Sequence, residues 1–176
     1  MSTRGVRDQF GPSAQAYVTS ERHARGPDLA RLVELADPRG DEVLLDVATG
    51  AGHTLRAFST RVGLPIGLDA TDEMLRAARD VVADPRARFI QGDVAALPLA
   101  DESVDLATCR VAAHHFADVR RAFSEIARIL RPGGAFLFVD NHAPDDPALD
   151  AFLNTLERTR DATHVREHRL AEWQAL

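Results

Sequence analysis

The feature that most constrains the fold is an apolar run that leads directly into a glycine-bearing turn, between Val43 and Gly52. The apolar residues of this run suit a strand that is buried on both faces. Gly50 and Gly52 allow the backbone to turn tightly and to come close to a bound ligand. Because a helix-like stretch follows from His53 to Val62, we expect a cofactor to lie at this turn.

A second apolar run, from Leu64 to Leu68, ends at Asp69. In nucleotide-binding units, a carboxylate at this distance from the glycine turn accepts hydrogen bonds from ribose hydroxyls. Either half alone is a weak signal, because a Gly-x-Gly sequence more often forms an ordinary turn. The prediction depends on the order of strand, glycine turn, helix, strand and terminal carboxylate.

Strands and helices are expected to alternate along the rest of the chain. The pattern predicts further strands at 86–91, 104–109 and 135–140. It predicts amphipathic helices at 29–36, 72–82 and 119–130. Thr71 and Asp118 are the expected N-caps of the last two helices. This alternation implies a doubly wound α/β fold with parallel strands and helices on both faces. Ligands then lie at the carboxyl ends of the strands, which carry Asp46, Asp69, residues 91–94, Arg110 and Asp140.

The absence of lysine excludes several classes of enzyme, since all 21 basic residues are arginines. Phosphate-loop nucleotide hydrolases need a lysine at the phosphates, and Schiff-base enzymes need a lysine amine. Dehydrogenases with a Tyr-x-x-x-Lys motif need their lysine as well. Arginine cannot replace it in this chemistry, because its guanidinium stays protonated.

Charge and cysteine content limit the partners and the compartment. The formal net charge of −6 argues against a nucleic-acid partner, because a phosphate backbone is bound chiefly by basic patches. Cys109 is the single cysteine, so no internal disulfide can form. The sequence contains no apolar run long enough to span a bilayer. We therefore expect one cytoplasmic domain without a membrane span.

Four stretches of the sequence carry a family resemblance, and with their surroundings they cover Phe10 to Asp140. They are residues 45–52, 67–75, 92–105 and 131–134. Together they resemble the class I S-adenosylmethionine-dependent methyltransferases, in the branch of the ubiquinone and menaquinone biosynthesis enzymes. The sequence departs from the broad family at Ala48, where glycine is more common. The resemblance implies a Rossmann-like, mostly parallel sheet in the order 3-2-1-4-5, with a turn at 131–134 before the fifth strand.

The groups of S-adenosylmethionine, and of its product S-adenosylhomocysteine, suggest which residues hold it. One carboxylate can accept both ribose hydroxyls, and Asp69 is placed for this role. Asp93 and the backbone N–H of Val94 suit the adenine edge, and Ala70 and Met74 suit its faces. The methionine end fits a set made of Asp46, Ala48, Thr49, Gly50 and Arg110. Two alternatives stay open: Asp93 as a turn-forming aspartate, and Asp46 as a residue that orients the glycine turn.

A general base is needed only if the small-molecule acceptor must lose a proton. The candidates are His114 and His115, followed by His142, Tyr17 and His23. For each of them the alternative is an ordinary hydrogen-bonded side chain. Adjacent histidines do not make a closed metal shell, so we expect no metal.

The two ends of the chain are expected to differ from the core at 40–140. Residues 1–25 resemble the mobile lid of this branch, and a frayed terminus is the alternative. The pattern predicts helices at 147–162 and from 168 onward, where the family continues into two further strands. We therefore interpret 145–176 as a truncated end of the single domain 1–176, and expect the fifth strand to be an exposed edge that favours a homodimer.

Three functions from different classes follow. The first is methyl transfer from S-adenosylmethionine to a small-molecule acceptor. The second is a nicotinamide-dependent oxidoreductase, which shares the glycine turn and the ribose carboxylate, although the lysine-free sequence and the segment at Gly92 count against it. The third is a cofactor-binding but inactive truncated module.

Overall fold

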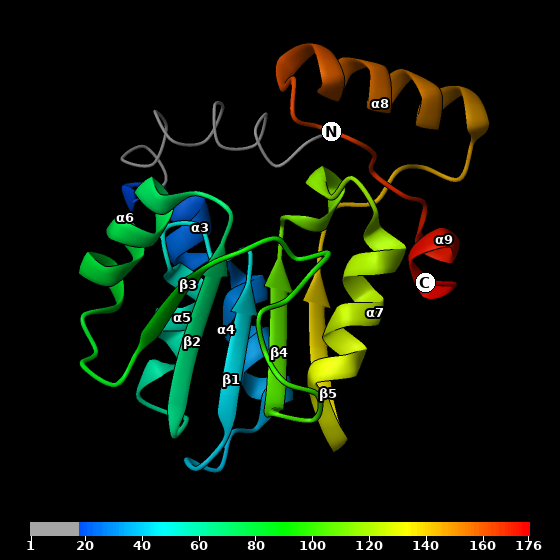
Figure 1. Ribbon diagram of the computed structural model, residues 1–176. Helices are drawn as coiled ribbons and strands as arrows, with labels where there is room; N and C mark the ends of the chain where they lie inside the picture. The colour runs from blue at the N-terminus through cyan, green and yellow to red at the C-terminus, as the bar shows by residue number, and fades with distance from the viewer. Residues whose placement is uncertain (1–17) are drawn as a thin grey trace.

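A parallel sheet of five strands organises the computed structural model, which describes residues 18–176 except for the side chains of residues 22 and 23. The order of the strands is β3-β2-β1-β4-β5, as the family resemblance implies. Their bounds are β1 (Val43–Val47), β2 (Leu64–Asp69), β3 (Arg88–Gln91), β4 (Val104–Arg110) and β5 (Leu130–Val139). All the arrows in Figure 1 point the same way, so the carboxyl ends share one edge.

Helices connect these strands and cover the sheet (Figure 1). They are α3 (Glu21–Arg25), α4 (Pro27–Ala36), α5 (His53–Ser59), α6 (Asp72–Val82), the 3-10 helix η1 (Ala113–His115), α7 (Val119–Ile129), α8 (Pro147–Arg160) and α9 (Leu170–Gln174). The expected helices are all present in the described residues, with ends that differ from the sequence pattern by a few positions.

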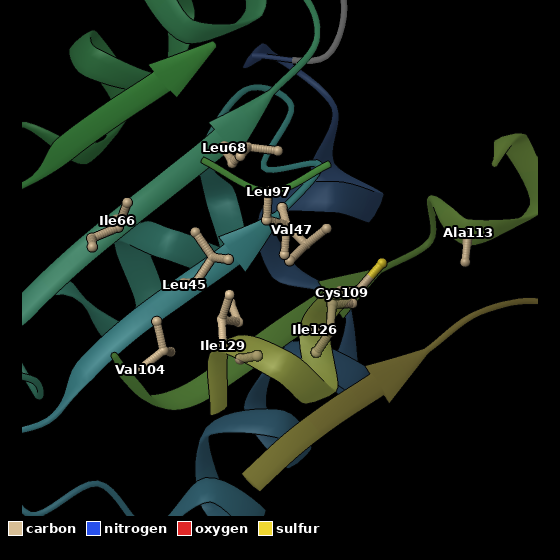
Figure 2. Close-up of a cluster of buried hydrophobic side chains, with 11 residues drawn as sticks. Leu45, Val47, Ile66, Leu68, Leu97, Val104, Cys109, Ala113, Ile126 and Ile129 are labelled. Atoms are coloured by element: carbon tan, nitrogen blue, oxygen red, sulfur yellow. The ribbon is translucent and has the colours of Figure 1, made fainter. Parts of the chain in front are cut away.

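The apolar core lies in two layers, one on each face of the sheet. Neighbouring residues of β1 point to opposite faces, so Leu45 joins one cluster and Leu44 the other. Figure 2 shows the first cluster, where Ile126 and Ile129 of α7 face the central strands. The second cluster contains Leu32 of α4 together with side chains of α5 and α6. Both faces are therefore buried, which explains the continuous apolar runs of the strands.

The start of β5 differs from the sequence prediction. The prediction of a turn at 131–134 before the strand is wrong, because these residues lie inside β5, which begins at Leu130. Leu130 pairs with Val104, and the register then shifts so that Ala135 pairs with Leu106. The Pro-Gly-Gly sequence is accommodated in this irregularity, where Gly133 takes a φ of 83°.

The two predicted N-caps have different outcomes. The Asp118 carboxylate accepts a hydrogen bond from the backbone N–H of Arg121 at 2.9 Å, so the N-cap of α7 is confirmed. Thr71 occupies the N-cap position of α6, but its side chain makes no capping hydrogen bond there.

The segment after α8 returns to the carboxyl edge of the sheet. Asn154 of α8 is almost fully buried and holds this segment: its Oδ1 accepts the backbone N–H of Glu167 at 2.8 Å, and its Nδ2 donates to the Glu167 carbonyl at 3.1 Å. Trp173 of α9 packs against Phe138 and donates to the carbonyl of Asn141 at 3.0 Å. These contacts fasten residues 161–174 to the end of β5.

Within residues 18–176, no helix is both long enough and apolar enough to cross a bilayer. Most of the lid predicted at 1–25 lies outside the described residues, as does the candidate base Tyr17. The side chain of His23, another candidate, is also outside the described part.

Candidate functional site

The candidate site lies at the carboxyl edge of the sheet, where β1 ends between its two neighbours. Val47, the last residue of β1, pairs with Leu68 of β2 and with Cys109 of β4. The glycine loop, which we define as residues 48–52, leaves β1 at this point and leads into α5. Residues that follow β2 and β4 therefore emerge on either side of the loop (Figure 1).

The glycine loop owes its shape to three residues with positive φ: Ala48 at 53°, Gly50 at 53° and Gly52 at 85°. At Gly52 an added Cβ would lie 3.0 Å from the Cα of Ala78, so only glycine fits between the loop and α6. At Gly50 an added Cβ would meet no atom within 4 Å. The loop is thus closely packed at Gly52 and open at Gly50, where its backbone is accessible to a ligand. Ala48 takes the left-handed conformation although it is not glycine, at a cost of about 1 kcal/mol.

Asp69 joins the end of β2 to this loop. One carboxylate oxygen accepts the backbone N–H of Gly50 at 2.9 Å, and the other accepts the N–H of Thr71 at 2.9 Å. The side chain is mostly buried, and this burial raises the pKa of the carboxyl group. Since each carboxylate oxygen can accept a second hydrogen bond, Asp69 remains able to bind a pair of hydroxyl groups.

Asp46 lies beneath the loop, fully buried. Its two oxygens accept the hydroxyl groups of Thr49 at 2.6 Å and Thr108 at 2.7 Å. Burial raises the pKa of Asp46 to about 6, and the two hydroxyl donors limit the increase. This geometry matches the alternative in which Asp46 orients the glycine turn: it fixes Thr49 in place and connects the loop to β4.

The four residues predicted around adenine follow the ends of β2 and β3. The exposed Asp93 accepts the backbone N–H of Ala95 at 2.9 Å, which is the bond of a turn-forming aspartate. Val94 is half-buried against the core, and Met74 of α6 is buried. The carbonyl of Ala70 accepts the Gln91 side chain at 3.0 Å. The backbone N–H of Gly92 donates to the Asp69 carbonyl at 3.0 Å, so these turns are connected to the backbone of Asp69.

Arg110, at the end of β4, forms an ion pair that the sequence analysis missed. Its Nε lies 2.5 Å from Oδ2 of Asp28 on α4, and its side chain is almost completely buried. The hydrogen bond from Arg110 lowers the pKa of Asp28. No sequence pattern connects Asp28 to a strand residue that lies 82 positions later in the chain.

His114 and His115 lie in η1, just beyond β4, and the structure adds a third imidazole to them. The ring centroids of His114 and His115 are 4.1 Å apart, and His164 lies 5.7 Å from His114. We call these three residues the histidine cluster. The backbone N–H groups of Val165 and Arg166 donate to the His114 carbonyl at 2.9 and 3.1 Å, which fixes the segment after α8 on η1.

Each ring of the histidine cluster has a different partner. His114 Nδ1 lies 2.6 Å from Oδ1 of Asp140, whose side chain is completely buried. His115 Nδ1 lies 3.1 Å from the Thr163 hydroxyl, and His164 Nε2 lies 3.1 Å from Oδ1 of Asn154. The pKa of His115 is lowered to about 4, mainly by burial and then by its proximity to His114. Burial also lowers the pKa of His164.

His142, the other candidate among the described side chains, is not part of this cluster. His142 is exposed, and its Nδ1 lies 3.2 Å from the Ala143 carbonyl. Within the described part of the chain, no three His, Cys, Asp or Glu side chains are arranged to hold a metal ion. Cys109 is fully buried in β4, and burial raises the pKa of its thiol. The sequence placed Asp140 at a strand end without a role, and it gave no signal for His164 or Asn154.

Three of the residues predicted to hold S-adenosylmethionine lie at this edge of the sheet: Gly50, Asp69 and Asp93. The open backbone at Gly50 lies next to a carboxylate, Asp69, that has unused acceptor capacity. The Asp93 turn, connected through Gly92 to Asp69, supplies a second acidic side chain on the side of β3.

Comparison with known proteins gives matches over most of the chain. Residues 45–138 match the family model described as "Methyltransferase domain". An uncharacterized methyltransferase, YcgJ of Bacillus subtilis, is 46% identical over 170 residues, which is 95% of this chain and 67% of YcgJ. A demethylmenaquinone methyltransferase of Roseiflexus sp. is 36% identical over 69% of this chain and 52% of its own length.

The solved structure of Bacillus subtilis YcgJ has the same fold, with a TM-score of 0.80 and 49% identity. The superposition covers 84% of this chain and 64% of that chain. The chain therefore spans about two thirds of the length of YcgJ. Both relatives are methyltransferases by name, so they support the first of the three predicted functions and not the oxidoreductase alternative.

Proposed function

Because the chain belongs to the class I S-adenosylmethionine-dependent methyltransferases of the ubiquinone and menaquinone biosynthesis branch, we propose that it transfers the methyl group of S-adenosylmethionine to a small-molecule acceptor by in-line displacement. The observation that carries this proposal is the Asp69 carboxylate, held by the N–H groups of Gly50 and Thr71 beside the open part of the glycine loop. Alignment of two bound reactants contributes roughly 7–11 kcal/mol to such a reaction.

The contacts that we propose are supported by the geometry of the glycine loop and its neighbours. Asp69 accepts the ribose hydroxyls, and the backbone of Ala48, Thr49 and Gly50 surrounds the methionine end, with Asp46 supporting Thr49 from below. Asp93, Val94, Ala70 and Met74 belong to the adenine side. Arg110 contributes to the methionine side through the charge that it adds near Asp46, where it lowers the pKa of that group. His114 and His115 are the candidates for proton transfer.

Calorimetry with S-adenosylhomocysteine and with NAD tests this proposal. We expect the wild-type chain to bind S-adenosylhomocysteine, and Asp69→Asn to weaken binding roughly 10- to 150-fold, because a hydrogen bond to a charged group is worth about 1.5–3 kcal/mol. Asp80→Asn, which removes an exposed carboxylate of α6, is the matched control and should bind like the wild type. Binding of NAD without S-adenosylhomocysteine would overturn the proposal.

The proposal extends to the organisation of the protein. It includes a single methyltransferase domain with a lid at 1–25, a core at 40–140 and helices at 145–176, a cytoplasmic location and no nucleic-acid partner. In the described sheet β5 pairs only with β4, so its other edge is available for a homodimer through strand pairing. Light scattering of the purified chain checks the dimer, and a monomeric mass would rule it out.

A further inference from the structure

The orientation of His114 is fixed by a single carboxylate. Asp140 accepts the imidazole Nδ1–H through Oδ1 at 2.6 Å and the backbone N–H of His114 through Oδ2 at 3.1 Å. Oδ1 also accepts the backbone N–H of Asn141 at 2.8 Å. Because both oxygens of this carboxylate already accept backbone N–H groups, Asp140 acts as the acceptor toward His114 Nδ1, and Nε2 is the ring nitrogen that can accept a proton.

The other two rings of the histidine cluster are used differently. The Thr163 hydroxyl donates to the Asp161 carboxylate at 2.6 Å, so it accepts from His115 Nδ1. His164 is attached to Asn154 of α8. Both rings therefore fasten the segment after α8 to its neighbours. For His114, by contrast, no hydrogen bond to Nε2 is present among residues 18–176, although the residue is more than nine-tenths buried.

Titratable groups around His114 come from several elements of the described structure. Asp140 follows β5, His115 belongs to η1, and Glu157 lies on α8, while His164 and Glu167 follow α8. The two neighbouring imidazoles have a lowered pKa and are neutral near pH 7, so they do not repel a proton that arrives on His114.

This arrangement lies at the same edge of the sheet as the glycine loop. The chain passes from Arg110 of β4 to η1 through Val111, whose N–H donates to the carbonyl of Val139 at 2.7 Å. Asp140 is the residue directly after the end of β5. Because β4 is also the neighbour of β1, His114 follows the strand that adjoins the loop on the side opposite Asp69.

We propose that His114 Nε2 accepts the proton of the methyl acceptor and that Asp140 is the positioning residue that holds this tautomer. The acceptor is then a molecule whose methylated oxygen carries a weakly acidic proton, such as a phenol or an enol. This inference rests on the proposed function and deepens it. A neutral amine attacks before it loses a proton and does not need such a base, whereas a hydroxyl group becomes a good nucleophile only as its proton leaves.

Atoms and electrons balance in this step. S-adenosylmethionine, when bound, supplies an electrophilic methyl carbon on a positively charged sulfur. The O–H bond of the acceptor breaks and its proton moves to His114 Nε2, while an oxygen lone pair forms the new bond to the methyl carbon. The electron pair of the broken carbon–sulfur bond stays on sulfur, and the imidazolium then releases its proton to water.

Two measurements on Asp140→Asn test the inference. Nitrogen NMR of the imidazoles, assigned with His114→Gln, should show the Nδ1–H tautomer for His114 in the wild type and its loss in Asp140→Asn. With catechol, hydroquinone and 4-hydroxybenzoate as acceptors, kcat should fall roughly 10²- to 10⁴-fold while the affinity for S-adenosylhomocysteine stays unchanged. Asp140→Glu keeps the carboxylate and should recover part of the rate, and Asp145→Asn, at an exposed position nearby, is the matched control.

The outcomes separate this inference from the proposed function. An Nε2–H tautomer in the wild type, or an unchanged kcat in both Asp140→Asn and His114→Gln, would overturn it. Turnover of an amine such as histamine and of none of the hydroxyl compounds would overturn the acceptor class. Failure to bind S-adenosylhomocysteine would instead contradict the proposed function, and the tautomer of His114 would still be read without any ligand.

Discussion

The glycine loop and the histidine cluster lie at the same edge of the sheet, yet burial acts on them in opposite directions. In the loop region it raises the pKa of Asp46 to about 6, whereas in the cluster it lowers the pKa of His115 to about 4. In both cases the charged form is the one that burial disfavours. The same physical cause therefore makes the first region sensitive to rising pH and the second sensitive to falling pH.

The two regions also differ in how they are held together. The loop is fixed by residues close in sequence or on adjacent strands, such as Thr49 with Asp46 and Gly50 with Asp69. The histidine cluster joins η1 to residues about 50 positions later, through Thr163 and His115. Local backbone geometry dominates the first region, and long-range side-chain contacts dominate the second.

The largest expected effect is on the loop side. Gly52→Ala should lower the free energy of unfolding by roughly 2–4 kcal/mol, because a left-handed alanine costs about 1 kcal/mol and its Cβ overlaps the backbone of α6 for about 1–3 kcal/mol more. Urea denaturation measures this loss. Gly50→Ala is the matched control: it has a positive φ but open space, so it should cost only about 1 kcal/mol. Equal losses in the two variants would show that the packing against α6 contributes nothing.

The second prediction concerns the pH response of the loop region. Asp46 has a raised pKa in the folded state, so its contribution to stability is present below its ordinary pKa of 3.8 and is lost as the pH rises through about 6. Between roughly pH 4 and pH 7, the free energy of unfolding of the wild type should therefore fall by up to about 3 kcal/mol relative to that of Asp46→Asn. Denaturant unfolding of both proteins over this range measures the difference. A constant gap between them would contradict the raised pKa.

The third prediction concerns the pH response of the histidine cluster, which should have the opposite sign to that of the loop region. His115 has a lowered pKa, so its stabilising contribution is present above 6.5 and is lost as the pH falls through about 4. Between about pH 6.5 and pH 4, the free energy of unfolding of the wild type should fall by about 1–2 kcal/mol more than that of His115→Gln. This figure is smaller than the full pKa shift would give, because His115 is partly exposed to solvent. The change with pH is the quantity to compare, since the substitution also removes the bond to Thr163. If the wild type instead lost stability relative to His115→Gln as the pH rises, the lowered pKa of His115 would be contradicted.

The smallest effect lies outside both regions and serves as a reference for them. Asp118→Ala removes the hydrogen bond to the Arg121 N–H at the start of α7 and should cost about 1 kcal/mol. Asp118→Asn keeps an oxygen acceptor and should cost less. Thermal unfolding measures both changes. Neither variant should alter the affinity for S-adenosylhomocysteine, and a change there would mean that α7 contributes to the site.

The fold was largely predictable from the sequence, because its signals are local. Apolar runs that end in glycine or aspartate marked β1 and β2, and the helix periodicity marked α6 and α7. The prediction was wrong about where β5 begins: Arg131 to Gly134 have turn chemistry, but Leu130 before them and Ala135 after them both pair with β4, so the four residues form an irregularity inside the strand. Pairing energy from a neighbouring strand is not visible in a short window of sequence.

For the site, the sequence by itself determined the residue types at the strand ends, including Asp69, His114 and Asp140, since strand length and order place them at one edge. Only the tertiary structure decided which of them meet. It placed Asp46 beneath the loop, paired Arg110 with Asp28, and brought Asp140 and His164 to His114. The physical reason is that a strand fixes where a residue ends up along the sheet, whereas the partner of a side chain depends on elements that are distant in sequence and pack against it only in the folded state.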